Sequence, residues 1–140
     1  MPKKSIKVIV TGGAGFIGSH LVSALIGSDY EVHVIDNLST GKKEKIHPKA
    51  IFHKKDIRDL KSILPIFKGA KYVFHLAALP RIQLSIEDPK TTHDINADGT
   101  LNVLLASKKS GVEKVIYSAS SSAYGNQKKL PLKENFPACP

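Results

Sequence analysis

A glycine-rich turn near the N-terminus constrains this chain more than any other feature of its sequence. The apolar, β-branched run Ile6–Val10 stops at the segment Thr11–Gly18, which reads Thr-Gly-Gly-Ala-Gly-Phe-Ile-Gly. Beyond it, Phe16–Gly27 carries apolar residues at three- and four-residue spacing, which predicts a helix. Glycines at such a turn let the backbone approach a pyrophosphate closely, with free N–H groups facing the anion. The segment therefore predicts phosphate binding, although a tight turn without a ligand would use the same glycines.

An acidic residue after the second predicted strand narrows the choice of ligand. The run Glu31–Ile35 is expected to form that strand, and Asp36 follows it, 18 residues after Gly18. A carboxylate in this position accepts hydrogen bonds from the ribose diol of a dinucleotide. Because it would repel the 2′-phosphate of NADP, the expected cofactor is NAD. The positively charged Lys42 and Lys43 lie nearby in the chain and would instead favour NADP.

Short apolar runs alternate with helical patterns along the rest of the chain. Further strands are expected at Ala50–His53, Lys71–Leu76 and Val112–Tyr117, and helices at Asp59–Phe67 and Asp88–Ser110. This alternation predicts an α/β fold of the Rossmann type, a doubly wound parallel sheet in the order 3-2-1-4-5. From Gly125 onward no periodic element is expected. Because a complete domain of this kind adds a helix and a strand, we expect residues 1–140 to form one NAD-binding domain that is incomplete at its C-terminal side.

Composition excludes several other classes of protein. With 41% hydrophobic and 24% charged residues among 140, the chain has the composition of a globular protein and not of a disordered one. Its single cysteine, Cys139, cannot form an internal disulfide or a cysteine-based metal site, so nothing indicates an oxidising compartment. We expect no metal site. No apolar run approaches the ~20 residues needed to span a bilayer, and no signal-peptide cleavage site follows the basic N-terminus. We therefore expect a cytoplasmic protein without a membrane partner.

The net charge of +9 is concentrated in one part of the chain. Between Lys42 and Lys71 there are ten Lys and Arg residues against three acids. Such a patch could meet nucleic acid or an acidic partner. We favour a solvated loop and helix face, and expect no nucleic-acid partner.

Six short motifs occur along the whole length of the chain. They are Thr11–Gly18, Asp36–Gly41, Asp56–Asp59, His75–Ala78, Asn96–Thr100 and Ser118–Gly125. In this order they resemble the extended short-chain dehydrogenase/reductases, and among these the NAD-dependent epimerase/dehydratase family. Within the family, the sequence is most similar to the enzymes that epimerise UDP-sugars at C4.

The resemblance implies where an NAD molecule would lie. Its pyrophosphate would meet the glycine-rich turn, its adenosine ribose the loop Asp36–Gly41, and its adenine Asp56 and Ile57. The middle of the cofactor would lie on Leu76–Ala78. The implied cofactor-binding residues are Gly12, Gly15, Phe16, Ile17, Gly18, Asp36, Asn37, Ser39, Thr40, Gly41, Asp56, Ile57, Leu76, Ala77 and Ala78. Taken alone, Asp56 would also suit a solvated turn.

The resemblance also implies a catalytic role for Ser120. It stands four residues before Tyr124, where the family keeps a serine or threonine that hydrogen-bonds the sugar oxygen losing its proton. A serine-rich loop is also typical of plain turns. Related dehydratases carry an Asp-Glu pair directly after this residue, and related decarboxylases a glutamate at the second of these positions. Because Ser121 and Ser122 stand there, epimerisation is favoured. One departure is Pro80, followed by Arg81, where epimerases often carry a lysine.

The family's proton acceptor is a tyrosine with a lysine four residues later on a helix. The one formal match, Tyr124–Lys128, contains Gly125 and lies in a predicted loop, whereas such side chains share a face only on a helix. We therefore expect the catalytic pair and the substrate-binding region beyond Pro140. The chain would then be the inactive N-terminal part of a UDP-sugar epimerase that is a homodimer when complete. The alternatives are a non-catalytic NAD-binding module and another nucleotide-sugar-modifying member of the family.

Overall fold

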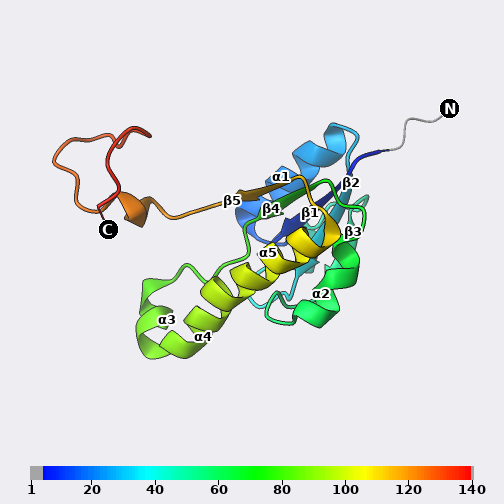
Figure 1. Cartoon of the computed structure of the whole chain (residues 1–140), viewed down its shortest axis with the longest axis horizontal. Coiled ribbons are helices and arrows are strands. Elements are labelled where there is room, and N and C mark those ends of the chain that lie inside the picture. The colour runs from blue at the N-terminus through cyan, green and yellow to red at the C-terminus, as the bar shows by residue number, and fades with distance from the viewer. Residues whose placement is uncertain (1–4, 140) are drawn as a thin grey trace.

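A five-stranded parallel sheet forms the centre of the computed structural model, which describes residues 5–139 (Figure 1). The strands are β1 (Lys7–Thr11), β2 (Glu31–Asp36), β3 (Ile51–Lys54), β4 (Tyr72–His75) and β5 (Lys114–Tyr117). They lie in the order β3-β2-β1-β4-β5, and each neighbouring pair is parallel. The predicted Rossmann-type order 3-2-1-4-5 is confirmed.

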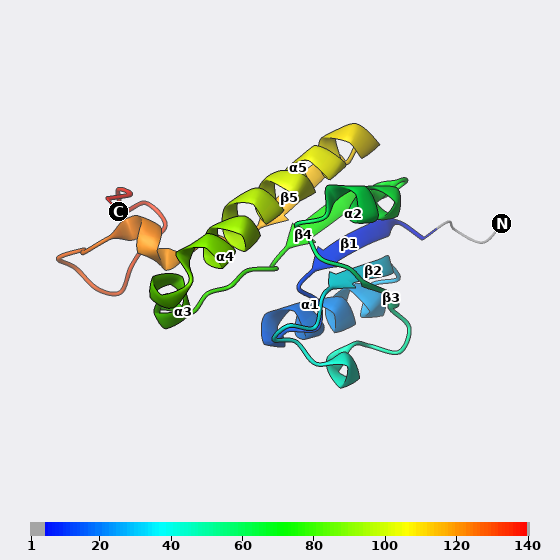
Figure 2. The same ribbon diagram turned by 90° about the horizontal axis from the view of Figure 1, so that it is seen from below.

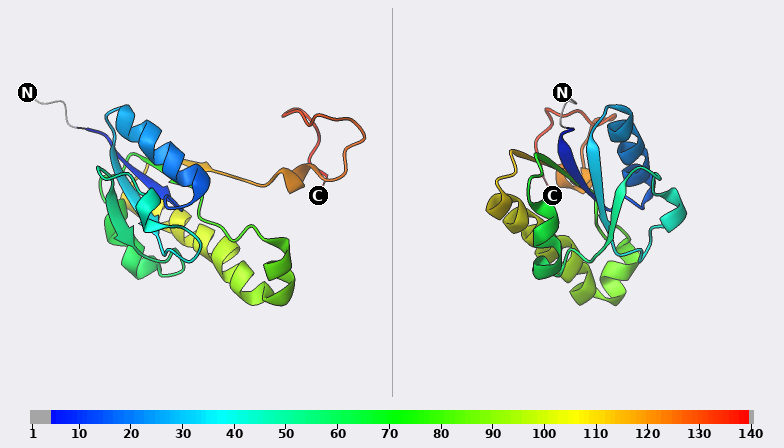
Figure 3. Two further views of the ribbon diagram at one scale, coloured as in Figure 1. Left: turned by 180° about the vertical axis from the view of Figure 1, so that it is seen from behind. Right: turned by 90° about the vertical axis from the view of Figure 1, so that its right-hand side faces the viewer.

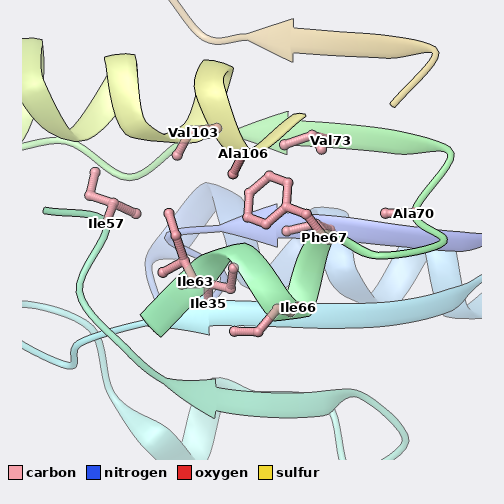
Figure 4. Packing of buried hydrophobic residues seen from close by; sticks show 10 residues of the cluster. Ile35, Ile57, Ile63, Ile66, Phe67, Ala70, Val73, Val103 and Ala106 are labelled. Carbon is pink, nitrogen blue, oxygen red and sulfur yellow. The ribbon is translucent and has the colours of Figure 1, made fainter. Parts of the chain in front are cut away.

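Helices cover both faces of this sheet, as Figure 2 shows. Helix α1 (Phe16–Gly27) packs on one face, over a buried cluster of valines and leucine from β1, β2 and the helix itself. Helices α2 (Leu60–Phe67) and α5 (Gly99–Ser110) pack on the other face, around Phe67 and Val73 (Figure 4). Successive side chains of a strand point to opposite faces, so a strand covered on both sides needs a continuous apolar run such as Val8–Val10.

The predicted helices are present, with one addition. Helix α1 has the predicted bounds, and Asp59 caps α2, its carboxylate accepting the Ser62 N–H at 3.2 Å. The predicted helix Asp88–Ser110 is a composite of α4 (Pro89–His93), a π-helical turn (Asp94–Asp98) and α5. The sequence did not indicate α3 (Ile82–Glu87), because a six-residue helix without a side-chain cap carries little pattern.

The edge of the sheet at β5 is less covered than its centre. On the edge strand β5, Ile116 is 39% and Tyr117 56% exposed, and on α5 Leu101 is 53% and Leu104 46% exposed. Residues 125–139 contain no helix or strand, as predicted, and the chain beyond β5 runs away from the sheet (Figure 3). Over residues 5–139, no helix has the length and apolar character needed to cross a membrane.

Candidate functional site

A cleft of about 480 Å³ opens at the carboxyl edge of the sheet. This volume lies within the range of roughly 300–1,000 Å³ that is typical of small-molecule sites. All fifteen residues predicted to hold the cofactor line this cleft. Seven residues that were not predicted to bind the cofactor complete its wall: Ile35, Lys55, Leu79, Pro80, Ile95, Ser118 and Ala119. Ser118 and Ala119 belong to a predicted motif, and Ile35, Lys55, Leu79 and Ile95 each directly precede or follow one. Ile95 comes from the π-helical turn.

The glycines of the turn after β1 are needed for different structural reasons. Gly12 has a φ of +72°, and a Cβ on it would lie 2.8 Å from the backbone nitrogen of Ala77. A Cβ on Gly18 would overlap the carbonyl oxygen of Gly12. Gly15 lines the cleft, and a Cβ there would meet only the Gly12 oxygen, at 3.2 Å. Gly12 and Gly18 are therefore required by packing, whereas Gly15 leaves space in the cleft itself.

The N-terminus of α1 faces the same cleft. The helix begins at Phe16, its N-cap is Gly15, and no side chain caps it. The first N–H groups of a helix have no partner within the helix and carry a partial positive charge. Phe16 and Ile17 are also exposed at this end. The arrangement fits a bound pyrophosphate, since the anion would supply the missing acceptors.

Asp36 joins two loops of the cleft. The Ala14 N–H donates to its Oδ2 at 3.0 Å, and the Leu38 N–H donates to its Oδ1 at 2.8 Å. The second of these bonds holds Leu38 at a φ of +62°, in the left-handed region that non-glycine residues rarely adopt. Each carboxylate oxygen keeps a further lone pair for a ribose hydroxyl. The sequence identified this acid but not its bonds to the backbone.

Asp56, which also lines the cleft, accepts hydrogen bonds from two neighbouring side chains. The Arg58 Nε donates to its Oδ1 at 3.0 Å and the Arg58 Nη2 to its Oδ2 at 2.8 Å, and Asn37 donates to Oδ2 at 2.9 Å. The side-chain hydrogen bonds from Arg58 hold the pKa of Asp56 well below its usual range. Asn102 donates to the carbonyls of Ile57 and Arg58 at 3.0 and 2.9 Å. Asp56 is thus an ionised member of a network and not a solvated turn acid.

The predicted catalytic residue lies just outside the cleft. Ser118 and Ala119 line it, but Ser120 does not. The Ser120 Oγ accepts the Ser122 N–H at 3.1 Å and caps a 3₁₀ turn, Ser121–Tyr124. This is the turn chemistry that a serine-rich loop predicts, and the hydroxyl proton of Ser120 is not used by it. The catalytic role of Ser120 stays a prediction.

The formal tyrosine–lysine match does not lie on a helix. Tyr124 ends the 3₁₀ turn, and Gly125 follows with a φ of +61°. Gln127 folds back and donates to the Tyr124 carbonyl at 2.6 Å. Tyr124 and Lys128 are therefore not one helical turn apart, in agreement with the sequence argument.

The sheet order, the helix-capping glycine turn and the acid after β2 define a Rossmann-type α/β protein whose cleft lies at the carboxyl ends of the strands. The family of NAD-dependent epimerases and dehydratases matches residues 8–140, and the chain belongs to this family.

Relatives with similar sequences and structures are UDP-glucose 4-epimerases. A Methanocaldococcus jannaschii protein with the provisional name UDP-glucose 4-epimerase is 44% identical over 135 residues, which cover 95% of this chain and 44% of the relative. The structure of UDP-glucose 4-epimerase with UDP-glucose from Thermotoga maritima is 42% identical, with a TM-score of 0.90, covering 96% of this chain and 45% of that one. The Thermus thermophilus UDP-glucose 4-epimerase in complex with NAD is 37% identical, with a TM-score of 0.88 and the same coverage. The chain spans somewhat less than half the length of each relative.

Proposed function

We propose that this chain is the NAD-binding part of an enzyme that interconverts UDP-glucose and UDP-galactose. The observation that carries the proposal is the convergence of all the predicted cofactor residues on one cleft. They come from loops after β1, β2, β3 and β4, which only the parallel sheet brings together. Membership of the family and the likeness to UDP-glucose 4-epimerases support the choice of reaction.

The cofactor of the proposal is NAD. The start of α1 and Gly15 would hold the pyrophosphate, Asp36 the adenosine ribose, and Asp56 and Ile57 the adenine. When bound, NAD would supply the hydride acceptor and donor for oxidation and reduction of a sugar carbon. Asp36 is 9% exposed and its carboxylate accepts hydrogen bonds from two backbone N–H groups, so it would present a negative charge where NADP would bring a second one. NADP is therefore disfavoured.

The reacting sugar would lie beside Ser118 and Ala119. Ser120 would donate its free hydroxyl proton to the sugar oxygen, next to Ser118 and Ala119 on the cleft wall. Ser121 and Ser122 offer no carboxylate for expelling water, which favours epimerisation over dehydration. The proton acceptor would be a tyrosine–lysine pair on a helix outside these 140 residues, so the chain alone is expected to have no turnover.

Assembly and location complete the proposal. The exposed leucines of α5, Leu101 and Leu104, would join the interface of a homodimer. The single cysteine, Cys139, is exposed and free, which suits the reducing cytoplasm.

The experiment that tests the proposal is a calorimetric titration of the chain with NAD. We expect saturable binding at one site. Gly15→Val is expected to abolish binding and keep the far-UV circular dichroism spectrum, because the new side chain would occupy the cleft and not the protein interior.

Gly18→Val is the matched variant. Its side chain would overlap the Gly12 carbonyl, so it is expected to lose the fold itself. Absence of NAD binding by the wild-type chain, or full binding by Gly15→Val, would contradict the proposal.

A further inference from the structure

Buried polar groups connect three elements directly behind the cleft. The Thr11 Oγ1 at the end of β1 lies 2.6 Å from the His75 Nδ1 at the end of β4, and the His75 Nε2 lies 2.9 Å from the Thr100 Oγ1 on α5. Thr11 is fully buried, and His75 is 1% exposed. These side chains form a row of hydrogen bonds, Thr11–His75–Thr100. The row continues at both ends, since the Ala77 N–H donates to Thr11 Oγ1 at 3.2 Å and Thr100 donates to the Asn96 carbonyl at 2.7 Å.

The hydroxyl protons fix the direction of this row. Thr100 has one hydroxyl proton and gives it to the Asn96 carbonyl, so its oxygen must accept a proton from the His75 Nε2. Burial lowers the pKa of His75 to about 4, which keeps the ring neutral near pH 7. Its Nδ1 then has a lone pair and accepts from Thr11, whose oxygen accepts from Ala77. All four hydrogen bonds run one way, from Ala77 to Asn96.

The row ends on the floor of the cleft. Ala77 is the middle of the strip Leu76–Ala78, which lines the cleft, whereas Thr11, His75 and Thr100 do not line it. The next residue, Leu79, is held by the Asn96 side chain, with hydrogen bonds of 2.8 and 3.1 Å to its N–H and carbonyl. The strip is therefore attached through Ala77 and again just beyond its end.

Within the described part of the chain, no charged group contributes to the lowered pKa of His75. Besides the two threonines, the ring stacks on Tyr117 of β5, with ring centres 5.6 Å apart. Burial is the one cause of its lowered pKa. Burial therefore favours the neutral ring, and the two threonines favour a single tautomer of it.

We propose that His75 is a positioning residue for the cofactor: as the neutral Nε2–H tautomer, it fixes the strip Leu76–Ala78 through Thr11 without touching the ligand. The inference rests on the proposed NAD binding and deepens it. It assigns part of the NAD affinity to three side chains that the ligand never contacts.

Nuclear magnetic resonance of the ¹⁵N-histidine-labelled wild-type chain tests the tautomer without any ligand. The His75 resonances are expected to show a protonated Nε2 and an unprotonated Nδ1, unchanged between pH 8 and pH 5.5. A protonated Nδ1 at neutral pH, or titration with an ordinary histidine pKa, would overturn the proposal.

Calorimetry with NAD tests the positioning. Thr11→Val removes the hydroxyl that joins Ala77 to His75, and Thr100→Val removes the acceptor of the Nε2 proton; each is expected to weaken NAD binding about tenfold. Thr11→Ser keeps a hydroxyl and is expected to restore most of the affinity. The control is Ser107→Ala, which deletes a buried hydroxyl on the same helix that donates to the Val103 carbonyl at 2.7 Å, outside the row. Its NAD affinity should equal that of the wild type.

The outcomes separate this inference from the proposed function. If the wild-type chain binds no NAD, both fail. If it binds NAD and the folded Thr11→Val or Thr100→Val variant binds it equally well, or if Ser107→Ala is weakened as much as they are, the inference alone fails.

Discussion

Two parts of the sheet differ in how completely helices cover them. The part around β1 and β2 is the covered side, and the edge at β5 is the open side. On the β1–β2 side, Val8–Val10 and Ile35 are fully buried between α1 and α2. On the β5 side, Ile116 and Tyr117 remain exposed beside the exposed leucines of α5. The covered side carries the glycine-rich turn and Asp36, whereas the open side leads to Ser120.

This difference separates two functions. The cofactor loops are fixed by hydrogen bonds within the covered side, such as those that the Ala14 and Leu38 N–H groups donate to Asp36. Ser120 is exposed, and among residues 5–139 its hydrogen bonds are to its own turn. Cofactor binding is therefore expected to be a property of these residues alone, while under the proposed function turnover is expected to need further groups around the open side.

The largest expected effect concerns turnover. With UDP-galactose and excess NAD, the chain alone should show no measurable conversion, because loss of general-base catalysis costs about 10²–10⁴-fold. A coupled assay for UDP-glucose measures it, with Tyr124→Phe as the control. Conversion by the wild type that disappears in Tyr124→Phe would place the base at Tyr124 and remove the distinction between the two sides.

Substitution of Asp36 tests whether the covered side selects NAD over NADP. Asp36→Asn removes a charge that would accept ribose hydroxyls, so NAD affinity is expected to fall about 10- to 100-fold, while discrimination against NADP is lost. Asp29→Asn removes an exposed charge in the turn before β2 and is the matched control. Calorimetry with both cofactors measures the effect. Unchanged discrimination in Asp36→Asn would mean that the acid serves the loops only.

The covered core should also respond to acid. The folded pKa of His75 is about 4, below its ordinary value of 6.5, so the unfolded chain binds the proton more tightly. Stability is then full above pH 6.5 and falls toward pH 4, by up to about 3 kcal/mol. The lowered pKa of His53 acts in the same range. Asp56, whose pKa is depressed, contributes stability above about pH 4 that is lost only at lower pH.

Urea unfolding at pH 7, 5.5 and 4.5 measures this slope. His75→Asn should be less stable at pH 7 and lose part of the slope, whereas His93→Gln, an exposed histidine on α4, should keep it. The same slope in His75→Asn as in the wild type would contradict the assignment.

The smallest effect on stability is expected on the open side. Leu101→Lys with Leu104→Lys should change the free energy of unfolding by less than about 0.5 kcal/mol per site, because both side chains are exposed. The double variant should nevertheless associate less, since it breaks up an apolar patch. Light scattering against concentration measures this. Equal association of wild type and variant would show that the exposed leucines of α5 do not drive association.

The sequence predicted those features that depend on local pattern. The glycine turn, α1, Asp36 and the sheet order follow from residue spacing and from the backbone freedom that glycine provides. The row Thr11–His75–Thr100 could not be foreseen, because its members are far apart in the chain and meet only in the folded sheet. Ile95 reaches the cleft through a π-helical turn that no periodicity indicated. Ser120 was identified by resemblance alone, and its geometry is that of a turn.

Side-by-side calorimetric titration of the wild-type chain with NAD and NADP tests most directly whether the covered side is a self-sufficient NAD site. We expect NAD to bind at one site and more tightly than NADP, because the buried Asp36 lines the cleft where we propose that the adenosine ribose lies. Equal affinity for the two cofactors, or no binding of either, would contradict this account.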